Sequence, residues 1–323
     1  MLTKSEAISQ LNKLGATSQP FSFYCDFLGE NWCIETDASN ESFQLEILDK
    51  GFNVHQTKSK LQRPTFKKHP IGFTEFNMAF DCVIQEINYG NSFLTNLTFE
   101  TLIETNLSLE EIFHYSRAKY KLLVPDQFVV FSPETFVKIE DGFIYSYPMK
   151  GTIDARLPDA EKKLLDDPKE TAEHVTIVDL IRNDLSQVSS KVEVSKFRYI
   201  DHLQTNDKHL LQVSSEVKGE LENNWKEQLG SILSKLLPAG SISGAPKPET
   251  IKIIQHNESY DRGYYTGICG HFDGNSLDTG VMIRYIKKSG NQLIFCSGGG
   301  ITSFSNAEKE YQEMVDKVYL SIY

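Results

Sequence analysis

The amino-acid sequence predicts an α+β fold in which antiparallel sheets are covered by helices. Amphipathic helical segments and paired strands follow one another without the strict strand–helix–strand rhythm of a parallel sheet. The pair Asp141-Gly142 between two apolar runs is typical of a tight antiparallel hairpin. The chain has 323 residues, of which 40% are hydrophobic and 24% charged, so it can bury the core of one large globular unit.

The first half of the chain is expected to begin with a helix and to continue mainly with strands. Ala7, Ile8, Leu11 and Leu14 recur at helical spacing, which predicts a short amphipathic helix. An aromatic strand over residues 21–27 follows. We then expect helices over 75–88 and 109–118, a turn at 90–91, and strands over 92–100, 127–131, 135–140 and 143–147.

The second half alternates helices and strands. The charged segment 154–167 is expected to be a loop. We expect helices over 169–185, 224–237, 248–255 and 306–322, and strands over 191–197, 210–221, 266–272, 280–287 and 292–297.

Composition excludes several classes of protein. The net charge of −11 argues against a nucleic acid as partner, and an acidic ligand would need a local cluster of cations. No stretch is long and apolar enough to span a membrane, and the N-terminus lacks an apolar signal core, so we expect a cytoplasmic protein. The five cysteines have no metal-binding spacing and are expected to be reduced packing residues.

Lys150 is the most informative single residue, because it lies in the turn 148–152 between a proline and Gly151, directly after an apolar strand. An ammonium group against apolar walls loses hydration, so its pKa falls and the neutral amine becomes a nucleophile. A lysine that is ion-paired or reaches out to solvent is the alternative.

Two helices carry pairs of glutamates that could hold a cation. Glu170 and Glu173 fall on the same face as the apolar stripe that begins at Ile177, and buried carboxylates are costly unless protonated, paired or bound to a cation. On the last helix, Glu310 and Glu313 have the same spacing. Four carboxylates suit Mg²⁺, whereas buried pairs of glutamate with arginine or lysine explain the pattern equally well.

Two glycine-containing segments and one arginine suggest an anion site. Gly298, Gly299 and Gly300 follow a strand, so that their N–H groups can point at a carboxylate or phosphate. Ser241 lies in a second glycine loop, residues 237–247. Arg284 is placed on an apolar strand, where an inward arginine usually meets a carboxylate.

The chain resembles the chorismate-utilising enzymes, which include the anthranilate, aminodeoxychorismate, isochorismate and salicylate synthases. The resemblance covers roughly residues 75–320, in the order expected for the family. The matching strings are Ser132–Phe136, Pro148–Thr152, Glu173–Asp184, Pro238–Lys247, Arg262–Gly267, Gly298–Ile301 and Glu310–Glu313 with Lys317. The resemblance implies the fold of anthranilate synthase component I, with two packed antiparallel sheets flanked by helices in α/β/β/α layers. It also implies one compact unit, in which a reduced N-terminal part (1–74) adjoins a chorismate-binding catalytic part (75–323).

Within the family, the turn around Lys150 resembles component I of aminodeoxychorismate synthase, because anthranilate synthases carry alanine at that position. This implies that Lys150 adds to chorismate as the 4-hydroxyl leaves, and that ammonia then displaces it to give 4-amino-4-deoxychorismate for para-aminobenzoate and folate synthesis. Glu134 matches the general acid/base. Since this sequence contains no glutaminase segment, the ammonia is expected from a separate glutamine amidotransferase subunit.

The resemblance also assigns the remaining site residues. It implies Mg²⁺ as the cofactor, with Glu173 and Glu313 as the firmer ligands and Glu170 and Glu310 as the outer ones. The residues expected to hold the two carboxylates of chorismate are Ser241, Tyr265, Arg284, Gly298, Gly299, Gly300 and Lys317.

Two positions depart from relatives in the family. Gln212 stands where many carry a histidine that is associated with pyruvate elimination, so we expect an enzyme that stops at the amino intermediate. Leu94 stands where water-adding relatives place a lysine base, which disfavours isochorismate synthesis. Anthranilate synthase component I and a catalytically inactive partner-binding homologue remain the alternatives.

Overall fold

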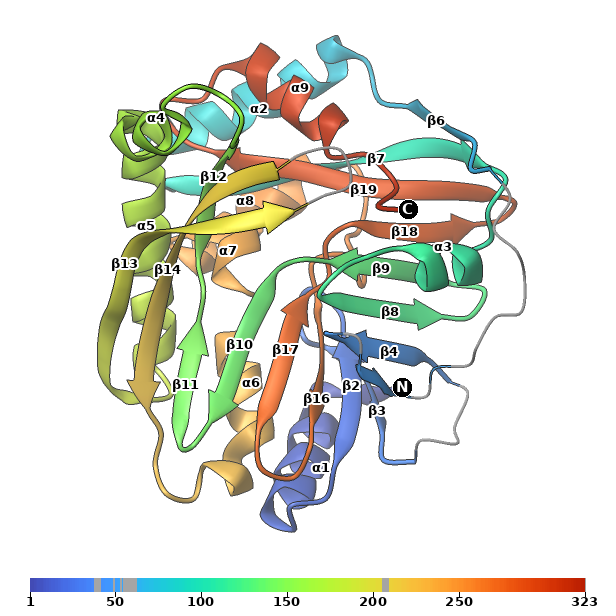
Figure 1. Ribbon diagram of the computed structural model, residues 1–323, viewed down its shortest axis with the longest axis vertical. Coiled ribbons are helices and arrows are strands. Elements are labelled where there is room, and N and C mark those ends of the chain that lie inside the picture. Colours follow the sequence, from blue (N-terminus) through green and yellow to red (C-terminus); the bar gives the residue numbers. More distant parts are fainter. Residues whose placement is uncertain (38–41, 49, 53, 55–62, 205–208, 323) are drawn as a thin grey trace.

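The computed structural model describes residues 1–37, 42–48, 50–52, 54, 63–204 and 209–322, and places them in two antiparallel sheets covered by helices (Figure 1). This confirms the predicted α+β class. The first sheet, in spatial order, comprises β1 (Leu2–Thr3), β3 (Asn31–Glu35), β2 (Phe21–Cys25), β16 (Ile268–Phe272), β17 (Leu277–Val281), β10 (Thr135–Glu140), β11 (Phe143–Ser146), β14 (His209–Glu220) and β12 (Met149–Asp154), with β13 (Ser190–Gln204) paired to β14.

The second sheet is built around the long strands β7 and β19, which pair antiparallel over nine residue pairs. Its strands, in spatial order, are β15 (Gly244–Ala245), β7 (Leu94–Thr105), β19 (Gln292–Ile301), β18 (Tyr285–Ser289), β9 (Phe128–Ser132), β8 (Tyr120–Val124), β4 (Gln44–Ile47) and β5 (Lys50–Phe52), with β6 (Phe66–His69) paired to β7.

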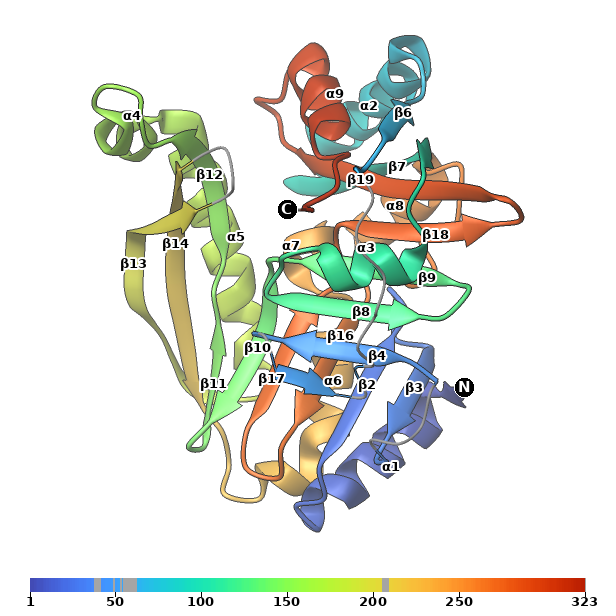
Figure 2. The same cartoon turned by 45° about the vertical axis from the view of Figure 1, so that its right-hand side comes forward.

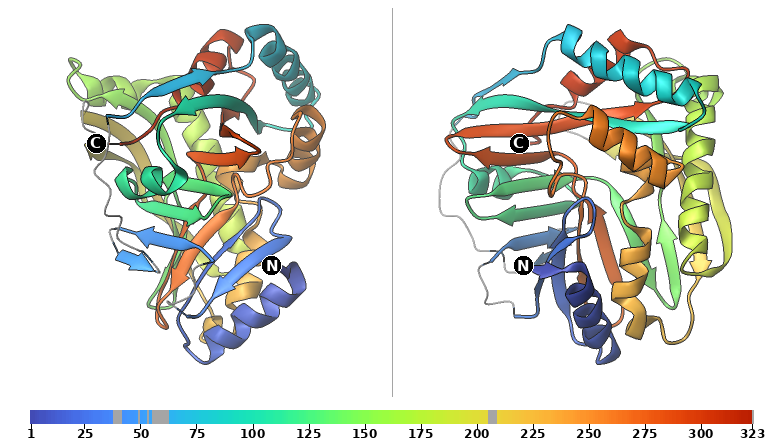
Figure 3. Two further views of the ribbon diagram at one scale, coloured as in Figure 1. Left: turned by 90° about the vertical axis from the view of Figure 1, so that its right-hand side faces the viewer. Right: turned by 180° about the vertical axis from the view of Figure 1, so that it is seen from behind.

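Helices cover the outer faces of both sheets. The first sheet packs against α1 (Lys4–Ala16), α5 (Pro168–Ser186), η1 (Trp225–Gln228) and α6 (Leu229–Leu236), which Figure 3 shows from behind. The second sheet packs against α2 (Phe73–Asn88), α3 (Leu109–Tyr115), α8 (Lys247–Asn257) and α9 (Ala307–Asp316). The short helices α4 (Ala160–Asp166) and α7 (Gly240–Ser243) lie at the rim of β12 and beside α5. No helix among the described residues is long and apolar enough to cross a membrane.

An aromatic core joins the inner faces of the two sheets. Tyr24 on β2 meets Phe43 and Phe128 edge-on, with ring centroids 5.2 and 5.7 Å apart, a geometry that aromatic quadrupoles favour. Tyr120 on β8 is fully buried; its hydroxyl donates a hydrogen bond of 2.6 Å to Asp278 Oδ1 and lies 3.0 Å from the Thr135 hydroxyl, both on the first sheet. The expected division at residue 74 stays a prediction, although strands before it contribute to both sheets: β2 pairs with β16 and β4 with β8.

At two of the places where the chain passes from one sheet to the other, the link is only two or three residues long. A single strand was expected over 280–287, but β17 ends at Val281 in the first sheet and β18 begins at Tyr285 in the second (Figure 2). Between them, Arg284 has a positive φ of 54°, so the backbone turns sharply there. The other crossing is Pro133–Glu134, between β9 and β10.

Four further expectations need correction. The charged segment 154–167 contains α4, whose Ala160 and Leu164 are buried against β14 and so give it an amphipathic face. The last helix ends at Asp316 rather than at 322, because Ile322 instead forms a β-bridge to Ser116. The turn expected at 148–152 is largely strand β12, and the glycines expected after a strand lie within β19.

The close approach of the sheets leads to a prediction about stability. A methyl group at Gly280 on β17 would collide with the ring of Tyr120. We expect Gly280→Ala to lower the free energy of unfolding by about 2 kcal/mol, measured by urea denaturation, because the buried ring has no room to shift. Gly72→Ala, at a glycine whose Cα faces open space, is the matched control; because Gly72 is the N-cap of α2, where alanine is less favourable, it should lower stability by no more than about 1 kcal/mol. Equal effects of the two substitutions would contradict tight packing at Gly280.

Candidate active site

A pocket of about 260 Å³ opens where the two crossings meet β12, α7, β19 and the C-terminal end of α9. Both crossing segments contribute charged side chains to it, Glu134 from one and Arg284 from the other. The sequence-predicted residues that line this pocket are Glu134, Lys150, Ser241, Tyr265, Arg284, Gly298, Gly299, Gly300, Glu313 and Lys317.

Lys150 enters the pocket from β12, at a bulge in the pairing of β12 with β14. The next residue, Gly151, has a φ of +68°, and a side chain there would press on Glu170 and Leu164 of the neighbouring helices. The Lys150 Nζ donates a hydrogen bond of 3.1 Å to Oε2 of Glu173, a buried carboxylate on α5. The bulge and the glycine therefore turn the lysine toward α5.

The expected fall in the pKa of Lys150 is wrong for the protein as described. Burial does disfavour the charged amine, but the carboxylates of Glu173, Glu313 and Glu170 outweigh it, and they raise the pKa of Lys150. The ion-paired alternative from the sequence is therefore what the described side chains show. These carboxylates therefore favour the ammonium form of Lys150.

Glu134 has the environment of a general acid. Its Oε1 accepts a short hydrogen bond of 2.5 Å from the hydroxyl of Ser241, and its backbone N–H donates to Ser132 Oγ at 3.1 Å. Burial raises the pKa of the Glu134 carboxyl, although the Ser241 hydrogen bond and the nearby cations Arg284, Lys317 and Lys150 act in the opposite direction. A carboxyl with a raised pKa retains a proton that it can donate to a leaving group.

Lys317 enters the pocket from the C-terminal end of α9. Its Nζ donates to the backbone carbonyl of Gly298 at 2.8 Å and lies 2.7 Å from Oε1 of Glu313. Burial lowers the pKa of Lys317, and the Glu313 carboxylate partly compensates. An i,i+4 pair such as that of Glu313 with Lys317 is typical of a solvated helix face, but here it lines a pocket.

The four glutamates proposed as metal ligands lie around these lysines. Glu173 and Glu310 are buried, and a side-chain carbon placed on Gly299 would be 3.5 Å from Glu313 Oε1 and 3.6 Å from Glu310 Oε2. Among the described residues, no three His, Cys, Asp or Glu side chains gather closely enough to form a metal cluster. The chemistry of the donor set, carboxylate oxygens only, nevertheless fits Mg²⁺.

The glycine segment forms one wall of the pocket as a strand rather than as a loop. Gly298, Gly299 and Gly300 pair with Thr98, Leu97 and Asn96 of β7. A methyl group on Gly298 would collide with the carbonyl of Leu97, whereas the Cα atoms of Gly299 and Gly300 face the ionised side chains of the pocket.

Arg284 does not have the carboxylate partner expected for it. It lies on the crossing and not on a strand, and within the described part of the chain its guanidinium contacts only the hydroxyl and ring of Tyr319. Its charge is therefore available to an anion that enters the pocket.

The two departures noted in the sequence both lie in the wall. Leu94 is buried against Gly300, and Gln212 lies opposite Thr152 in the pairing of β14 with β12. No histidine is among the described residues that line the pocket. His174, one residue after Glu173, is buried behind it, and its Nε2 lies 2.7 Å from Ser215 Oγ. Burial lowers the pKa of His174 to about 4, so the ring is neutral.

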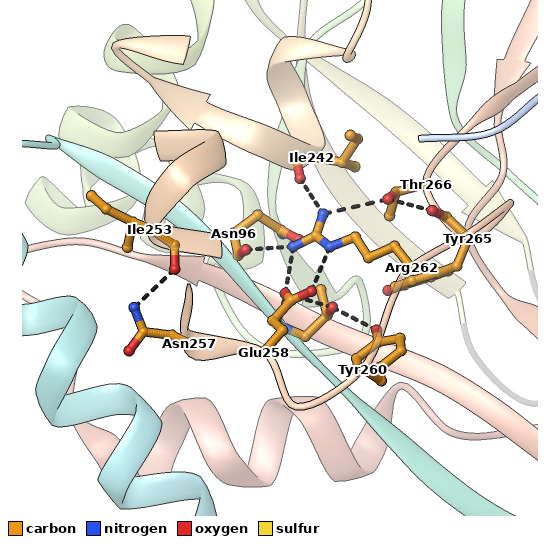
Figure 4. Close-up of polar contacts among 10 residues, drawn as sticks. Asn96, Ile242, Ile253, Asn257, Glu258, Tyr260, Arg262, Tyr265 and Thr266 are labelled. Atoms are coloured by element: carbon orange, nitrogen blue, oxygen red, sulfur yellow. Dashed lines mark hydrogen bonds and ion pairs between the residues drawn. The ribbon is translucent and has the colours of Figure 1, made fainter. Parts of the chain in front are cut away.

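A buried ion pair between Arg262 and Glu258 lies behind the pocket and was not predicted from the sequence (Figure 4). The string Arg262–Gly267 was matched to the family, but no role was predicted for Arg262. The spacing of four residues was a signal, yet α8 ends at Asn257, so the pair is not a helical one. Sequence reasoning also missed Asn96, a pocket residue whose Oδ1 is buried without a hydrogen-bond partner in the described structure.

The pocket contains three cationic side chains (Lys150, Arg284 and Lys317), the Glu134 carboxyl of raised pKa, and a wall formed by the backbone of three glycines. Such a site is typical of an enzyme that acts on a small anionic substrate. Comparison with known proteins identifies the class. Residues 18–322 match the chorismate binding enzyme family, and the chain belongs to that family.

The relatives differ in the activity that their names give. A PabA-like protein of Haemophilus influenzae is 50% identical over 323 residues, which cover 99% of this chain and 98% of the relative. The aminodeoxychorismate synthase component 1 of Bacillus subtilis is 31% identical, over 81% of this chain and 58% of its own length. An anthranilate synthase component 1 of Acetivibrio thermocellus is 34% identical, over 72% and 49% respectively.

Solved structures confirm the predicted fold of two packed sheets. Anthranilate synthase component I of Streptococcus pneumoniae superposes with a TM-score of 0.64 at 28% identity, over 80% of this chain and 59% of that one. The menaquinone-specific isochorismate synthase of Escherichia coli superposes with a TM-score of 0.76 over 98% and 81%, at an identity of 15% that speaks for the fold alone.

The raised pKa of Glu134 predicts a gain in stability when its charge is removed. At neutral pH the carboxylate is charged in the unfolded chain, and in the folded chain it is desolvated or must bind a proton. Glu134→Gln is therefore expected to increase the free energy of unfolding by about 1 kcal/mol at neutral pH. The increase should vanish as the pH falls through the raised pKa and then the ordinary one, because the wild-type carboxyl is then protonated in both states.

Urea denaturation at neutral and at acid pH measures this effect. Glu308→Gln, at an exposed carboxylate on α9, is the control and should change stability little at either pH. A loss of stability in Glu134→Gln at neutral pH would show that the surrounding cations outweigh burial.

Proposed function

We propose that this chorismate-binding enzyme acts as component I of aminodeoxychorismate synthase, adding ammonia to chorismate to give 4-amino-4-deoxychorismate. The observation that carries the proposal is the presence of Lys150 and the acid Glu134 in one pocket, both lining it and close enough for the lysine charge to influence the acid. The relationship to the Bacillus subtilis enzyme of that name supports it.

Binding of chorismate would use the cations that the pocket holds. The two carboxylates of the substrate are complementary to Arg284 and Lys317, which come from the crossing before β18 and from the end of α9. The Gly298–Gly300 wall, Ser241 and Tyr265 would supply further hydrogen bonds or contacts. This local positive charge offsets the acidic character of the whole chain.

The reaction would proceed in two substitutions. The neutral amine of Lys150 donates its electron pair to the ring, while the 4-hydroxyl departs as water with a proton from Glu134. Ammonia then forms the new C–N bond as the bond to Lys150 breaks, and the lysine leaves with the electron pair of that bond. Glu134, now a carboxylate, takes the surplus proton from the incoming nitrogen.

A Mg²⁺ ion would be held by Glu173 and Glu313, with Glu170 and Glu310 further out. When bound, it would neutralise a carboxylate of the substrate and part of the charge of Glu173. Glu173 is the largest attraction that keeps Lys150 charged, so the lysine must lose its proton to solvent water before its amine can attack the ring.

Amination without elimination agrees with the residues around Lys150. Gln212 cannot transfer protons, and His174 is engaged with Ser215 behind the wall, so the described pocket offers no imidazole base for removing pyruvate. Anthranilate synthesis remains the second candidate, because relatives with that name are as similar as the Bacillus subtilis enzyme. Ammonia would come from a separate glutamine amidotransferase subunit.

A product assay tests this proposal directly. The protein incubated with chorismate, Mg²⁺ and ammonium should form 4-amino-4-deoxychorismate and neither anthranilate nor pyruvate. Lys150→Ala and Glu134→Ala should each lower the rate about 10³-fold, because each removes a group that makes or breaks a bond. Mass spectrometry of the protein after denaturation during turnover should detect chorismate, less water, attached to Lys150.

Lys288→Ala, at an exposed lysine on β18 outside the pocket, is the control and should keep full activity. Direct formation of anthranilate would identify the second candidate. Absence of any turnover, or undiminished turnover in Lys150→Ala, would contradict the proposal and favour a partner-binding homologue.

Removal of the metal gives a separate prediction. Chelation with EDTA should abolish amination, and Glu310→Ala should weaken Mg²⁺ binding by about 100-fold, measured by calorimetry without substrate. Glu308→Ala, two residues away on the same helix but exposed, is the matched control. Equal Mg²⁺ affinity in the two variants would remove Glu310 from the site.

A further inference from the structure

The guanidinium of Arg262 is the centre of a buried network directly behind the pocket (Figure 4). It donates to both oxygens of Glu258, at 2.8 Å from Nε and 2.6 Å from Nη2. The side chains of this pair are only 2% and 1% exposed. Thr98 completes the carboxylate shell, because its backbone N–H and its hydroxyl both donate to Glu258 Oε1.

The remaining donors of Arg262 reach the pocket wall itself. Nη1 donates to the backbone carbonyl of Ile242 at 2.9 Å, and Nη2 to the backbone carbonyl of Asn96 at 2.7 Å. Nη1 also lies 3.4 Å from the hydroxyl of Thr266, a residue held at a φ of +63°. Ile242, Asn96 and Thr266 all line the pocket, and they come from three separate segments of the chain.

The hydrogen bond from Arg262 to the Ile242 carbonyl affects Glu134, the proposed general acid, through the neighbouring Ser241. Ile242 follows Ser241 in α7, a helix of only four residues that cannot hold its own position by internal hydrogen bonds. Ser241 is the residue whose hydroxyl binds Glu134 Oε1 at 2.5 Å. A shift of α7 would therefore lengthen or break the hydrogen bond between the Ser241 hydroxyl and the Glu134 carboxyl.

We infer that Arg262, oriented by Glu258, is a positioning residue that fixes α7 so that the Ser241 hydroxyl stays hydrogen-bonded to the Glu134 carboxyl. This inference deepens the proposed function, and it rests on that function only for its kinetic consequences. Arg262 touches neither the substrate-facing side of the pocket nor the reacting groups; it acts through Ser241.

The energetics of buried ion pairs favour this role over a purely stabilising one. Desolvation of both ions offsets most of their attraction, so such a pair adds little to stability relative to apolar residues. What a planar, forked guanidinium supplies is fixed geometry, here between Glu258 and two backbone carbonyls of the pocket wall.

The pKa of the Glu134 carboxyl can report the loss of the Ser241 hydrogen bond, because the groups that face Glu134 set this pKa. Ser241 lowers the pKa of the Glu134 carboxyl by hydrogen bonding, and Arg284, Lys317 and Lys150 lower it by their charge, while burial raises it. Loss of the Ser241 hydrogen bond must therefore raise the pKa of Glu134 further.

A double-mutant cycle tests the inference with Ser241→Ala and Arg262→Lys. Glutamate carboxyls labelled with ¹³C are titrated by NMR in the protein without substrate, and Glu134→Gln assigns the signal. Both single variants should raise the pKa of Glu134, and the double variant should raise it no further. In the amination assay each single variant should be slower by about 10-fold, and the double variant also by about 10-fold rather than 100-fold.

Lys121→Gln breaks another well-buried pair, 2.7 Å from Lys121 Nζ to Glu46 Oε1, between β8 and β4 and outside the pocket. This control should leave both the pKa of Glu134 and the activity unchanged. If Arg262→Lys does not fold, Glu258→Gln replaces it, since it keeps a hydrogen-bond acceptor for Arg262 without the charge.

An unchanged Glu134 pKa in a folded Arg262 or Glu258 variant, or additive effects in the cycle, would overturn the inference. So would failure of both variants to fold, because the pair would then support the whole fold. If the wild-type protein does not aminate chorismate, the proposed function fails, but the NMR titration still decides the role of Arg262.

Discussion

The buried contact between Glu258 and Arg262 links both sheets and the short helix α7. The arginine follows α8 and reaches a strand of the second sheet, the short helix α7 and the segment before β16 of the first sheet. A neutral side chain of similar size could fill the volume but could not bond three backbone and side-chain acceptors in one plane. The pocket lies at the junction that these contacts define.

Positive and negative side chains balance one another in the pocket, although the chain as a whole has a net charge of −11. In the described structure, Lys150 and Lys317 hold Glu173 and Glu313, so that cations and carboxylates compensate one another. An incoming dianion or a divalent metal ion would compete for these partners. Under the proposed function, binding of the substrate and of Mg²⁺ would therefore be coupled to the protonation of the lysines through the same few carboxylates.

Local pattern was sufficient for most elements, because alternation and helical periodicity depend on neighbours in sequence. The hairpin at Asp141-Gly142 and the bounds of β10 agree with expectation. The crossing at Arg284 was not predictable, since apolar residues continue on both sides of it while the chain changes sheets. The pKa of Lys150 was misjudged for the same reason: its sign depends on carboxylates from α5 and α9, which the sequence placed on helices but not beside the lysine. The Arg262 network joins segments more than 150 residues apart, and no local pattern reports it.

The glycine strand limits how this enzyme can diversify. Three successive wall positions carry no side chain, and a collision follows any added atom at Gly298. At Gly299 an added methyl group would meet the carboxylates of Glu313 and Glu310 at 3.5 and 3.6 Å, which is ordinary contact distance, so the wall tolerates little change beyond this one position. Substitutions that change the chemistry of the pocket are therefore expected at lining positions that do carry side chains, such as Leu94 and Gln212. The backbone of the glycine wall can stay the same while those side chains change.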